Sequence, residues 1–253
     1  MKNERLNKYL ASCGICSRRD ADKLIGEGRV SVNGQKASMG MQVSDCDLIL
    51  VNGKPVHGKD EKVVFAYNKP VGVICTERDR FADKKITDMV NFPVRVTYAG
   101  RLDKDSEGLI LLTNDGDLIR AMMSGSAGHE KEYIVKVNKE VTHDFLKKME
   151  NGVLLSELNI TTKPCKAEKT GKYTFRIILT QGVNRQIRRM TNELGYRAYA
   201  IKRVRVLNIQ LANLKTGQYR RISGNELRTL YNLCGMENKE KNGKNTKSSV
   251  MDK

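Results

Sequence analysis

The feature that most constrains the fold is a charged stretch, residues 99–108, that runs directly into the apolar strand Leu109–Thr113. Asn114–Asp117 then closes this strand, because Asx and Gly residues tolerate tight or left-handed backbone. The strand is expected to be buried, so the carboxylate of Asp103 just before it should lie at the mouth of a cleft.

A carboxylate in that place suggests chemistry as well as structure. If guanidinium groups lie beside Asp103, its carboxylate stays ionised and can act as a nucleophile or a base. The plainer alternative is a charged surface loop whose acids are simply solvated. Local sequence leaves both alternatives open.

Net charge points to a polyanionic partner. The chain of 253 residues has a formal charge of +17. Residues 61–236 carry most of it, with 31 Lys and Arg against 19 acids. A basic surplus within the folded part favours a nucleic-acid cleft over a basic tail alone. A merely basic soluble protein is the alternative.

Several other classes are disfavoured. No apolar run approaches the roughly 20 residues that span a bilayer, and no secretory leader is evident, so we expect a cytoplasmic protein. Of the six cysteines, only Cys13 and Cys16 have ligand-like spacing, and nothing completes a zinc site. No Gly-rich phosphate loop, HExxH motif or nucleophilic Ser or Cys motif is present.

Residues 1–58 predict a small helix-and-hairpin module. Residues 5–11 form a short amphipathic pattern, and Ser17 is a plausible N-cap for a second, basic helix. Two alternating segments then end at Asn33-Gly34 and Asn52-Gly53, the sequence signal for tight hairpins. This pattern resembles the RNA-binding module first described in ribosomal small-subunit protein four, here called S4-like. A helix-capped hairpin used only for packing is the alternative.

After a linker at 59–62, residues 63–235 read as a strand-dominated domain with a few helices. The fold class is α+β with a mixed or antiparallel sheet. Residues 77–85 predict a loop and 86–90 a helical turn. The remaining segment, 236–253, predicts a disordered basic tail. The elements expected in this domain are strands at 63–67, 94–98, 109–113, 129–137, 165–168, 173–179, 198–207 and 208–211, and helices at 118–124, 144–149, 184–194 and 223–232.

Several motifs together resemble ribosomal RNA pseudouridine synthases. The branch is the one typified by RsuA, RluB, RluE and RluF, with the RluF subfamily nearest. The motifs are Gly100-Arg101-Leu102-Asp103, Ser106-Glu107-Gly108-Leu109, Thr113-Asn114-Asp115-Gly116, His129-Glu130-Lys131-Glu132-Tyr133 and Asn184-Arg185-Gln186-Ile187-Arg188-Arg189-Met190. The resemblance covers nearly all of residues 4–233, with departures around 154–162 and beyond 236.

The resemblance implies a reaction and roles for residues. Uridine is isomerised to pseudouridine without metal or cofactor, in 23S (large-subunit) ribosomal RNA. Asp103 would be the nucleophile or base, Tyr133 would stack on the base, and Arg188 would pair with Asp103. Arg101 would fill the space that the flipped uridine leaves, and Lys69 would support the cleft. The expected RNA-binding residues are Arg101, Arg5, Arg18, Arg19, Lys23, Lys69, Arg185 and Arg189.

Three alternatives stay open. The substrate could be small-subunit ribosomal RNA or tRNA. The chain could be a catalytically silent RNA-binding or ribosome-assembly protein. Cleavage of the glycosidic bond would need a second carboxylate, which Asp105 or Glu107 could supply. We expect a monomer and no membrane partner.

Overall fold

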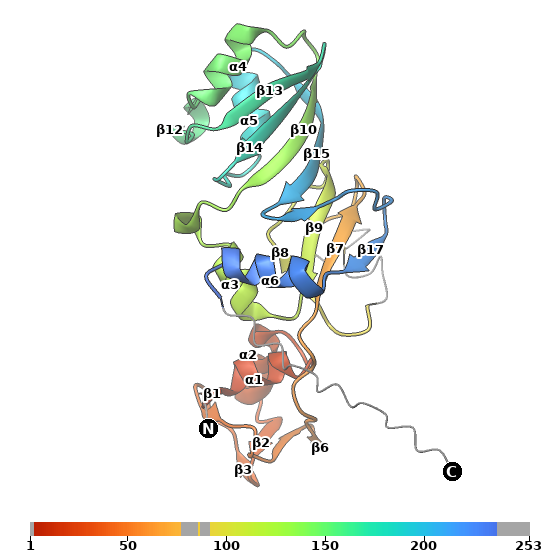
Figure 1. The fold of residues 1–253 in the computed structure, drawn as a ribbon. Coiled ribbons are helices and arrows are strands. Elements are labelled where there is room, and N and C mark those ends of the chain that lie inside the picture. The colour runs from red at the N-terminus through yellow and green to blue at the C-terminus, as the bar shows by residue number, and fades with distance from the viewer. Residues whose placement is uncertain (1–2, 77–85, 87–91, 237–253) are drawn as a thin grey trace, which may run out of the picture.

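The computed structural model describes residues 3–76, 86 and 92–236. It contains an N-terminal unit of small helices and hairpins, followed by a larger unit built on a nine-stranded sheet (Figure 1). Helices and strands alternate irregularly along the chain, so the expected α+β class is confirmed. The expected loop at 77–85, most of the helical turn at 86–90 and nearly all of the tail lie outside the described residues.

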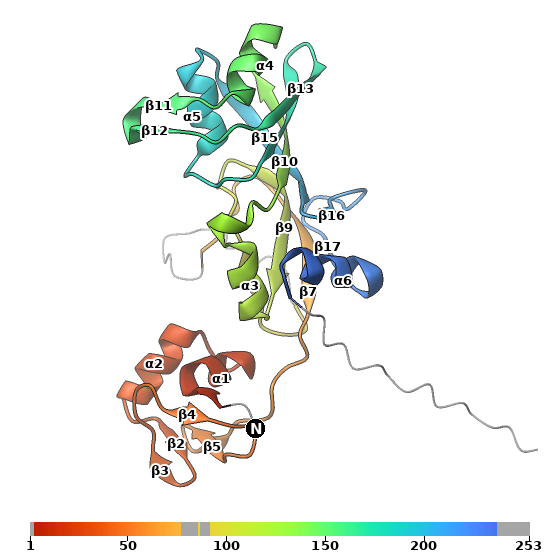
Figure 2. The same cartoon turned by 60° about the vertical axis from the view of Figure 1, so that its left-hand side comes forward.

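The N-terminal unit packs two helices on short strands (Figure 2). Its elements are β1 (Glu4–Arg5), α1 (Leu6–Ser12), α2 (Arg18–Gly26), β2 (Val30–Val32), β3 (Gln35–Lys36), β4 (Gln42–Val43), β5 (Ile49–Val51) and β6 (Lys54–Pro55). Ser17 caps α2 as expected, because its hydroxyl accepts from the Asp20 N–H at 3.2 Å. Asn33 and Gly34 have φ of 51° and 80°, the left-handed pair that a two-residue hairpin needs.

The large sheet has the order β13-β14-β10-β15-β9-β7-β17, with β8 beside β9 and β16 beside β15. Its strands are β7 (Val64–Lys69), β8 (Thr97–Ala99), β9 (Glu107–Thr113), β10 (Lys131–Val137), β13 (Lys166–Gly171), β14 (Thr174–Leu179), β15 (Ala198–Val206), β16 (Ile209–Gln210) and β17 (Tyr219–Arg221). Only the β9–β15 pair is parallel among the described strands, so the sheet is mixed. The edge strand β17 and the hairpin β11 (Leu154–Leu155) and β12 (Ile160–Thr161) were not predicted.

Helices cover this sheet in two groups. They are α3 (Gly116–Met122), α4 (His143–Glu150), α5 (Gln186–Glu193) and α6 (Gly224–Leu233), with 3-10 turns η1 (Gly125–Ala127) and η2 (Ser156–Leu158). Side chains of α4 and α5 pack with those of β10, β14 and β15 in one core, and side chains of α3 and α6 pack with those of β7 and β9 in another. Thr142 caps α4 as expected, since its hydroxyl accepts from the Phe145 N–H at 3.1 Å.

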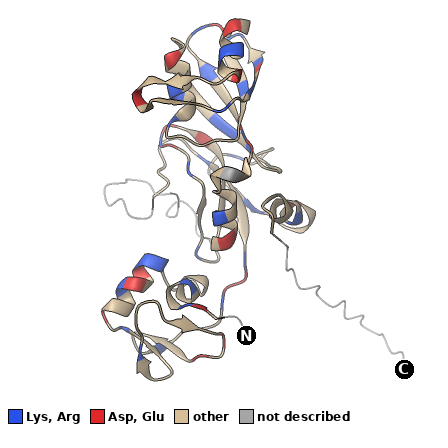
Figure 3. Cartoon of the chain, turned by 90° about the vertical axis from the view of Figure 1, so that its left-hand side faces the viewer, with Lys and Arg blue, Asp and Glu red and all other residues tan. Residues whose placement is uncertain are grey.

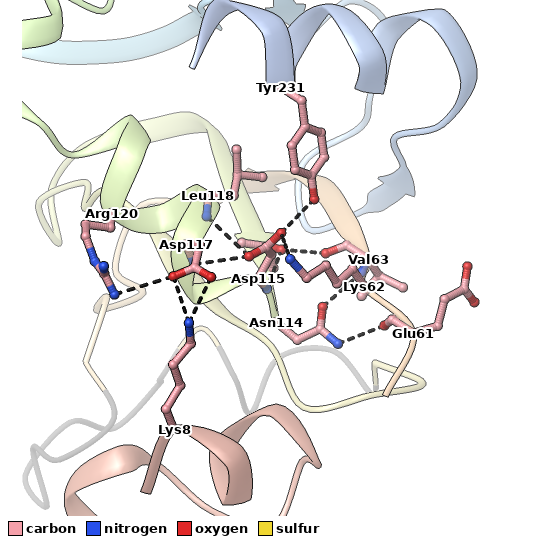
Figure 4. A network of polar contacts seen from close by, with 11 residues as sticks. Lys8, Glu61, Lys62, Val63, Asn114, Asp115, Asp117, Leu118, Arg120 and Tyr231 are labelled. Carbon is pink, nitrogen blue, oxygen red and sulfur yellow. Dashed lines mark hydrogen bonds and ion pairs between the residues drawn. The ribbon is translucent and has the colours of Figure 1, made fainter. Parts of the chain in front are cut away.

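The turn at 114–117 ties distant segments together (Figure 4). The Asp115 carboxylate caps α3 and accepts a hydrogen bond from the Tyr231 hydroxyl on α6 at 2.8 Å. The same carboxylate lies 2.7 Å from the Lys62 ammonium. Asp117 reaches the N-terminal unit through an ion pair with Lys8 on α1 at 3.0 Å. The turn therefore fixes the linker, the last helix and the first helix against one end of β9.

Candidate active site

Asp103 lies on the loop between β8 and β9. Leu102 is buried in the core behind the loop, so the next side chain, Asp103, is left half-buried at a cleft. The loop is closed by the Ser106 N–H, which donates to the Asp103 carbonyl at 3.1 Å, and held by the Gly72 N–H, which donates to the Lys104 carbonyl at 2.7 Å. Within the described residues, the Asp103 carboxylate itself has no hydrogen bond or ion pair, so it is available to a ligand.

The cleft has a volume of about 610 Å³, which is enough for a nucleotide-sized ligand. Asp103, Arg101, Tyr133 and Arg185, all expected at the site, line it. Lys131, Lys163 and Arg203 also line it, and none of these three was singled out from the sequence. The walls are therefore basic around one free carboxylate.

Tyr133 enters the cleft from the central strand β10. Strand alternation sends Lys131 and Tyr133 to the cleft side, whereas Glu132 lies on the other face and accepts from Arg205 at 2.8 Å. The Tyr133 ring packs against the cores of both halves of the sheet, which gives it a fixed orientation. A half-buried, fixed aromatic ring beside a cleft can stack on a planar base.

The structure corrects the expected partner of Arg188. Its guanidinium lies 3.3 Å from the carboxylate of Asp105, and its Nη2 donates to the Asp105 carbonyl at 2.9 Å. Arg185 binds the same carboxylate through two hydrogen bonds of 3.0 and 3.2 Å. Both arginines therefore hold Asp105, two residues beyond Asp103. Sequence alone could not separate these carboxylates, because they lie two residues apart on one loop and only the fold of that loop decides which of them meets the arginines.

Charge pairing at Asp105 is strong. Burial acts to raise the pKa of its carboxyl, but hydrogen bonds from Arg185 and the charges of Arg188 and Arg185 outweigh this and lower the pKa. The hydrogen bond to Asp105 in turn raises the pKa of Arg185. Arg185 has a left-handed backbone (φ 52°) directly before α5, which is a strained conformation for a residue with a side chain. This local strain accompanies the fixation of the Asp103 loop.

Lys69, placed among the expected RNA-binding residues, is not exposed to a ligand in this structure. The residue is fully buried, and its ammonium donates to the carbonyls of Pro70 and Val73, both at 2.9 Å. Burial lowers the pKa of Lys69, and the charge of Asp103 opposes this shift. These two hydrogen bonds hold the backbone of residues 70–73 against the end of β7.

The remaining expected RNA-binding residues lie in different places. Arg101 is exposed at the cleft. Arg189 is half-buried on α5, donates to the Asn184 carbonyl at 3.0 Å and pairs with Glu157. The other four are exposed on the N-terminal unit, outside the cleft: Arg5, Arg18, Arg19 and Lys23. Among them, the Lys23 ammonium lies 3.7 Å from the Glu27 carboxylate. Lys and Arg residues therefore occur along the ribbon of both units (Figure 3).

Lys131 and Arg203 are two of the three cleft cations that sequence reasoning missed. Lys131 is half-buried, and burial followed by the charge of Arg203 lowers its pKa. Alternation along 131–137 was a signal for Lys131, since it must share a face with Tyr133. Arg203 lies in a strand with several basic residues, so only the order of strands in the sheet reveals which of these residues faces the cleft.

Two features are absent from the described part of the chain. No helix there is long and apolar enough to cross a membrane. No group of three or more His, Cys, Asp and Glu residues there could hold a metal ion.

The chain is similar to known proteins over most of its length. Residues 63–193 match the family model described as RNA pseudouridylate synthase, and residues 4–49 match the S4 domain. The chain is 44% identical over 231 residues to the dual-specificity RNA pseudouridine synthase RluF of Escherichia coli K12, covering 90% of this chain and 79% of that protein. It is 39% identical over 239 residues to the ribosomal large subunit pseudouridine synthase B of Bacillus subtilis, covering 91% and 97%.

A solved structure agrees with these sequence matches. The crystal structure of a pseudouridylate synthase superposes with a TM-score of 0.66 at 30% identity, covering 89% of this chain and 99% of the other. The matches span both units, and the pseudouridylate synthase model spans the Asp103 loop, Tyr133 and α5. The chain belongs to the RNA pseudouridine synthases, isomerases that act on RNA, and carries an N-terminal S4 domain.

Proposed function

We propose that this enzyme converts a uridine of large-subunit (23S) ribosomal RNA to pseudouridine, with Asp103 as the catalytic carboxylate. The observation that carries the assignment is the environment of that carboxylate. It is half-buried in a basic cleft beside Tyr133, and no described residue forms a hydrogen bond or an ion pair with it. A binding protein for a polyanion gains nothing from a free acid in such a cleft, because the acid repels phosphate.

The chemistry is an isomerisation. The bond from C1′ of the ribose to N1 of uracil breaks, the base turns, and a bond from C1′ to C5 forms. C5 loses its proton and N1 gains one, so product and substrate have the same atoms and no electrons are exchanged. Asp103 supplies the carboxylate that acts as nucleophile or base. Tyr133 provides the surface on which the base stacks, and Arg101 fills the space left in the RNA.

Arg185 and Arg188 serve this step through Asp105. By holding the side chain and the carbonyl of Asp105, they fix the loop so that Asp103 faces the cleft. Asp105 is held ionised by the same contacts, so it is a poor proton donor at neutral pH. Glycosidic cleavage, which needs a protonated carboxyl as the acid, is therefore not favoured by Asp105.

The S4 domain would supply affinity rather than chemistry. Arg5, Arg18, Arg19 and Lys23 are exposed and can contact phosphates, which positions an RNA without reading its sequence. The relative from Bacillus subtilis is named a ribosomal large subunit pseudouridine synthase, which supports large-subunit ribosomal RNA as the substrate. The relative from Escherichia coli is named a dual-specificity RNA pseudouridine synthase. With ribosomal RNA as substrate, the protein would act in the cytoplasm as a monomer.

Nucleoside analysis of unmodified large-subunit ribosomal RNA tests this proposal. New pseudouridine is expected after incubation with the wild-type protein and none with Asp103→Asn, while both bind the RNA within a few-fold of each other. Appreciable product from Asp103→Asn would contradict the role of Asp103. If product formed only on small-subunit ribosomal RNA or only on tRNA, that RNA would replace the proposed substrate. If the protein bound these RNAs and formed product on none of them, a silent binding protein would be favoured.

A further inference from the structure

The nine-stranded sheet is joined across a short seam. The strands β13-β14-β10-β15 form one group and β9-β7-β17 the other, and β9 and β15 connect them (Figure 1). Their parallel register contains two residue pairs, Lys202 with Glu107 and Arg203 with Gly108. Tyr133 belongs to the first group, whereas the loop with Asp103 leads into β9 of the second. The distance between these two side chains therefore depends on how the seam is held.

Arg203 occupies this seam. It pairs with Tyr133 of β10 on one side and with Gly108 of β9 on the other. Its side chain is 2% exposed and crosses to the second group. There Nε donates to the Leu109 carbonyl at 2.6 Å and Nη1 to the Arg101 carbonyl at 3.4 Å. These two carbonyls lie on either side of Asp103 in the chain, so one guanidinium holds the backbone before and after it.

Close approach of the two backbones makes this contact possible. Gly108 has φ of 104°, and a Cβ at this position would lie 2.3 Å from the Arg203 carbonyl oxygen. Any side chain at 108 would push β9 away from β15. The glycine thus brings the loop end within reach of the guanidinium.

Packing alone does not account for an arginine here. On the opposite face of the same strand, Arg205 is paired with Glu130 and Glu132 at 2.9 and 2.8 Å. Arg203 has no carboxylate partner among the described residues, and its Nη2 is buried without a hydrogen-bond partner. A buried cation without an anion is unfavourable for folding, and an apolar side chain of similar volume would fill the space at lower cost.

We propose that Arg203 is a positioning residue, which holds the Asp103 loop against the strand that carries Tyr133. This inference rests on the proposed roles of those two residues. Arg203 acts through the backbone carbonyls of Arg101 and Leu109, and it fixes the carboxylate relative to the stacked base. Misplacement of a reacting group by about 1 Å can cost about 100-fold in rate. The effect should fall on the chemical step and leave RNA binding largely intact.

Arg203→Met tests this, because it keeps an unbranched side chain of similar volume and removes the donors. Arg205→Met is the matched control, since it removes an arginine from the same strand on the opposite face. We would measure the single-turnover rate of pseudouridine formation with saturating enzyme, and the Kd for the same RNA. Arg203→Met should lower the rate about 100-fold and change the Kd less than about threefold. The control should keep both values within about threefold of wild type.

Arg203→Lys provides a second, conservative variant. Its ammonium can reach one carbonyl but cannot span both, so the rate should lie between those of wild type and Arg203→Met. If Arg203→Met does not fold by circular dichroism, Arg203→Lys decides. A rate within about threefold of wild type for the folded variant, or a loss that appears equally in Kd, would overturn the inference. An inactive wild-type protein would instead overturn the proposed function on which it rests.

Discussion

Asp115 makes the sharpest prediction for stability. Its side chain is almost fully buried, and one carboxylate serves three segments (Figure 4). Oδ1 accepts from the N–H groups of Asp117 and Leu118 at 3.1 and 3.3 Å, and Oδ2 accepts from the Tyr231 hydroxyl at 2.8 Å. The Lys62 ammonium completes the set at 2.7 Å.

Asp115→Ala removes all of these contacts. Loss of the helix cap costs about 1 kcal/mol, and loss of the hydrogen bond from the Tyr231 hydroxyl to a charged acceptor costs about 1.5 kcal/mol. The side chain of Lys62 is 59% exposed, so solvent screening limits its ion pair to about 0.5 kcal/mol. The free energy of unfolding should therefore fall by about 3 kcal/mol, which corresponds to roughly 6–12 °C in Tm for a protein of this size.

Urea denaturation followed by circular dichroism measures this loss directly. Tyr231→Phe is the matched variant, because it removes only the hydroxyl and should cost about 1 kcal/mol. In the double variant the two effects should not add, since they share one hydrogen bond. A loss below about 1 kcal/mol for Asp115→Ala, or full additivity with Tyr231→Phe, would refute the reasoning.

Three further predictions concern the cleft and the RNA. Gly108→Ala should lower both Tm and turnover, because its Cβ would lie 2.3 Å from the Arg203 carbonyl oxygen; unchanged melting and activity would contradict the close approach. The pKa of Asp105 is lowered, so its pairing with arginine stabilises the fold at pH values above the ordinary carboxyl pKa of 3.8. This stabilisation is lost as the pH falls through the pKa of the folded state. The difference in unfolding free energy between wild type and Asp105→Asn should therefore shrink on acidification, and a constant difference from pH 6 to pH 2 would refute it. Deletion of residues 1–58 should weaken RNA binding and reduce its dependence on salt, which filter binding at several salt concentrations measures; equal affinity and slope would show that the S4 domain does not contribute.

Sequence signals predicted the secondary structure well where the structure depends only on a few neighbouring residues. Ser17 and Thr142 cap their helices because a cap needs only the next three residues. Asn33-Gly34 forms its turn because left-handed backbone is a property of the dipeptide. The short edge strand β17 was missed, since its strand character comes from pairing with β7 far away in the chain.

The residues around the cleft divide in the same way. The motifs identified Asp103, Tyr133, Arg101 and Arg185, and all four line one cavity. They did not identify Arg203, whose role depends on the order of strands in the sheet.

By itself, the sequence determined an α+β chain with an S4-like module, a basic cleft and a carboxylate at its mouth. These features follow from periodicity, turn chemistry, charge and motif, all of which are written within short windows. Only the tertiary structure decided that Arg188 and Arg185 hold Asp105, that Lys69 is buried and that Arg203 spans the seam. A long cationic side chain can reach many partners, and the one it contacts is selected by backbone segments that are distant in sequence and adjacent only after folding.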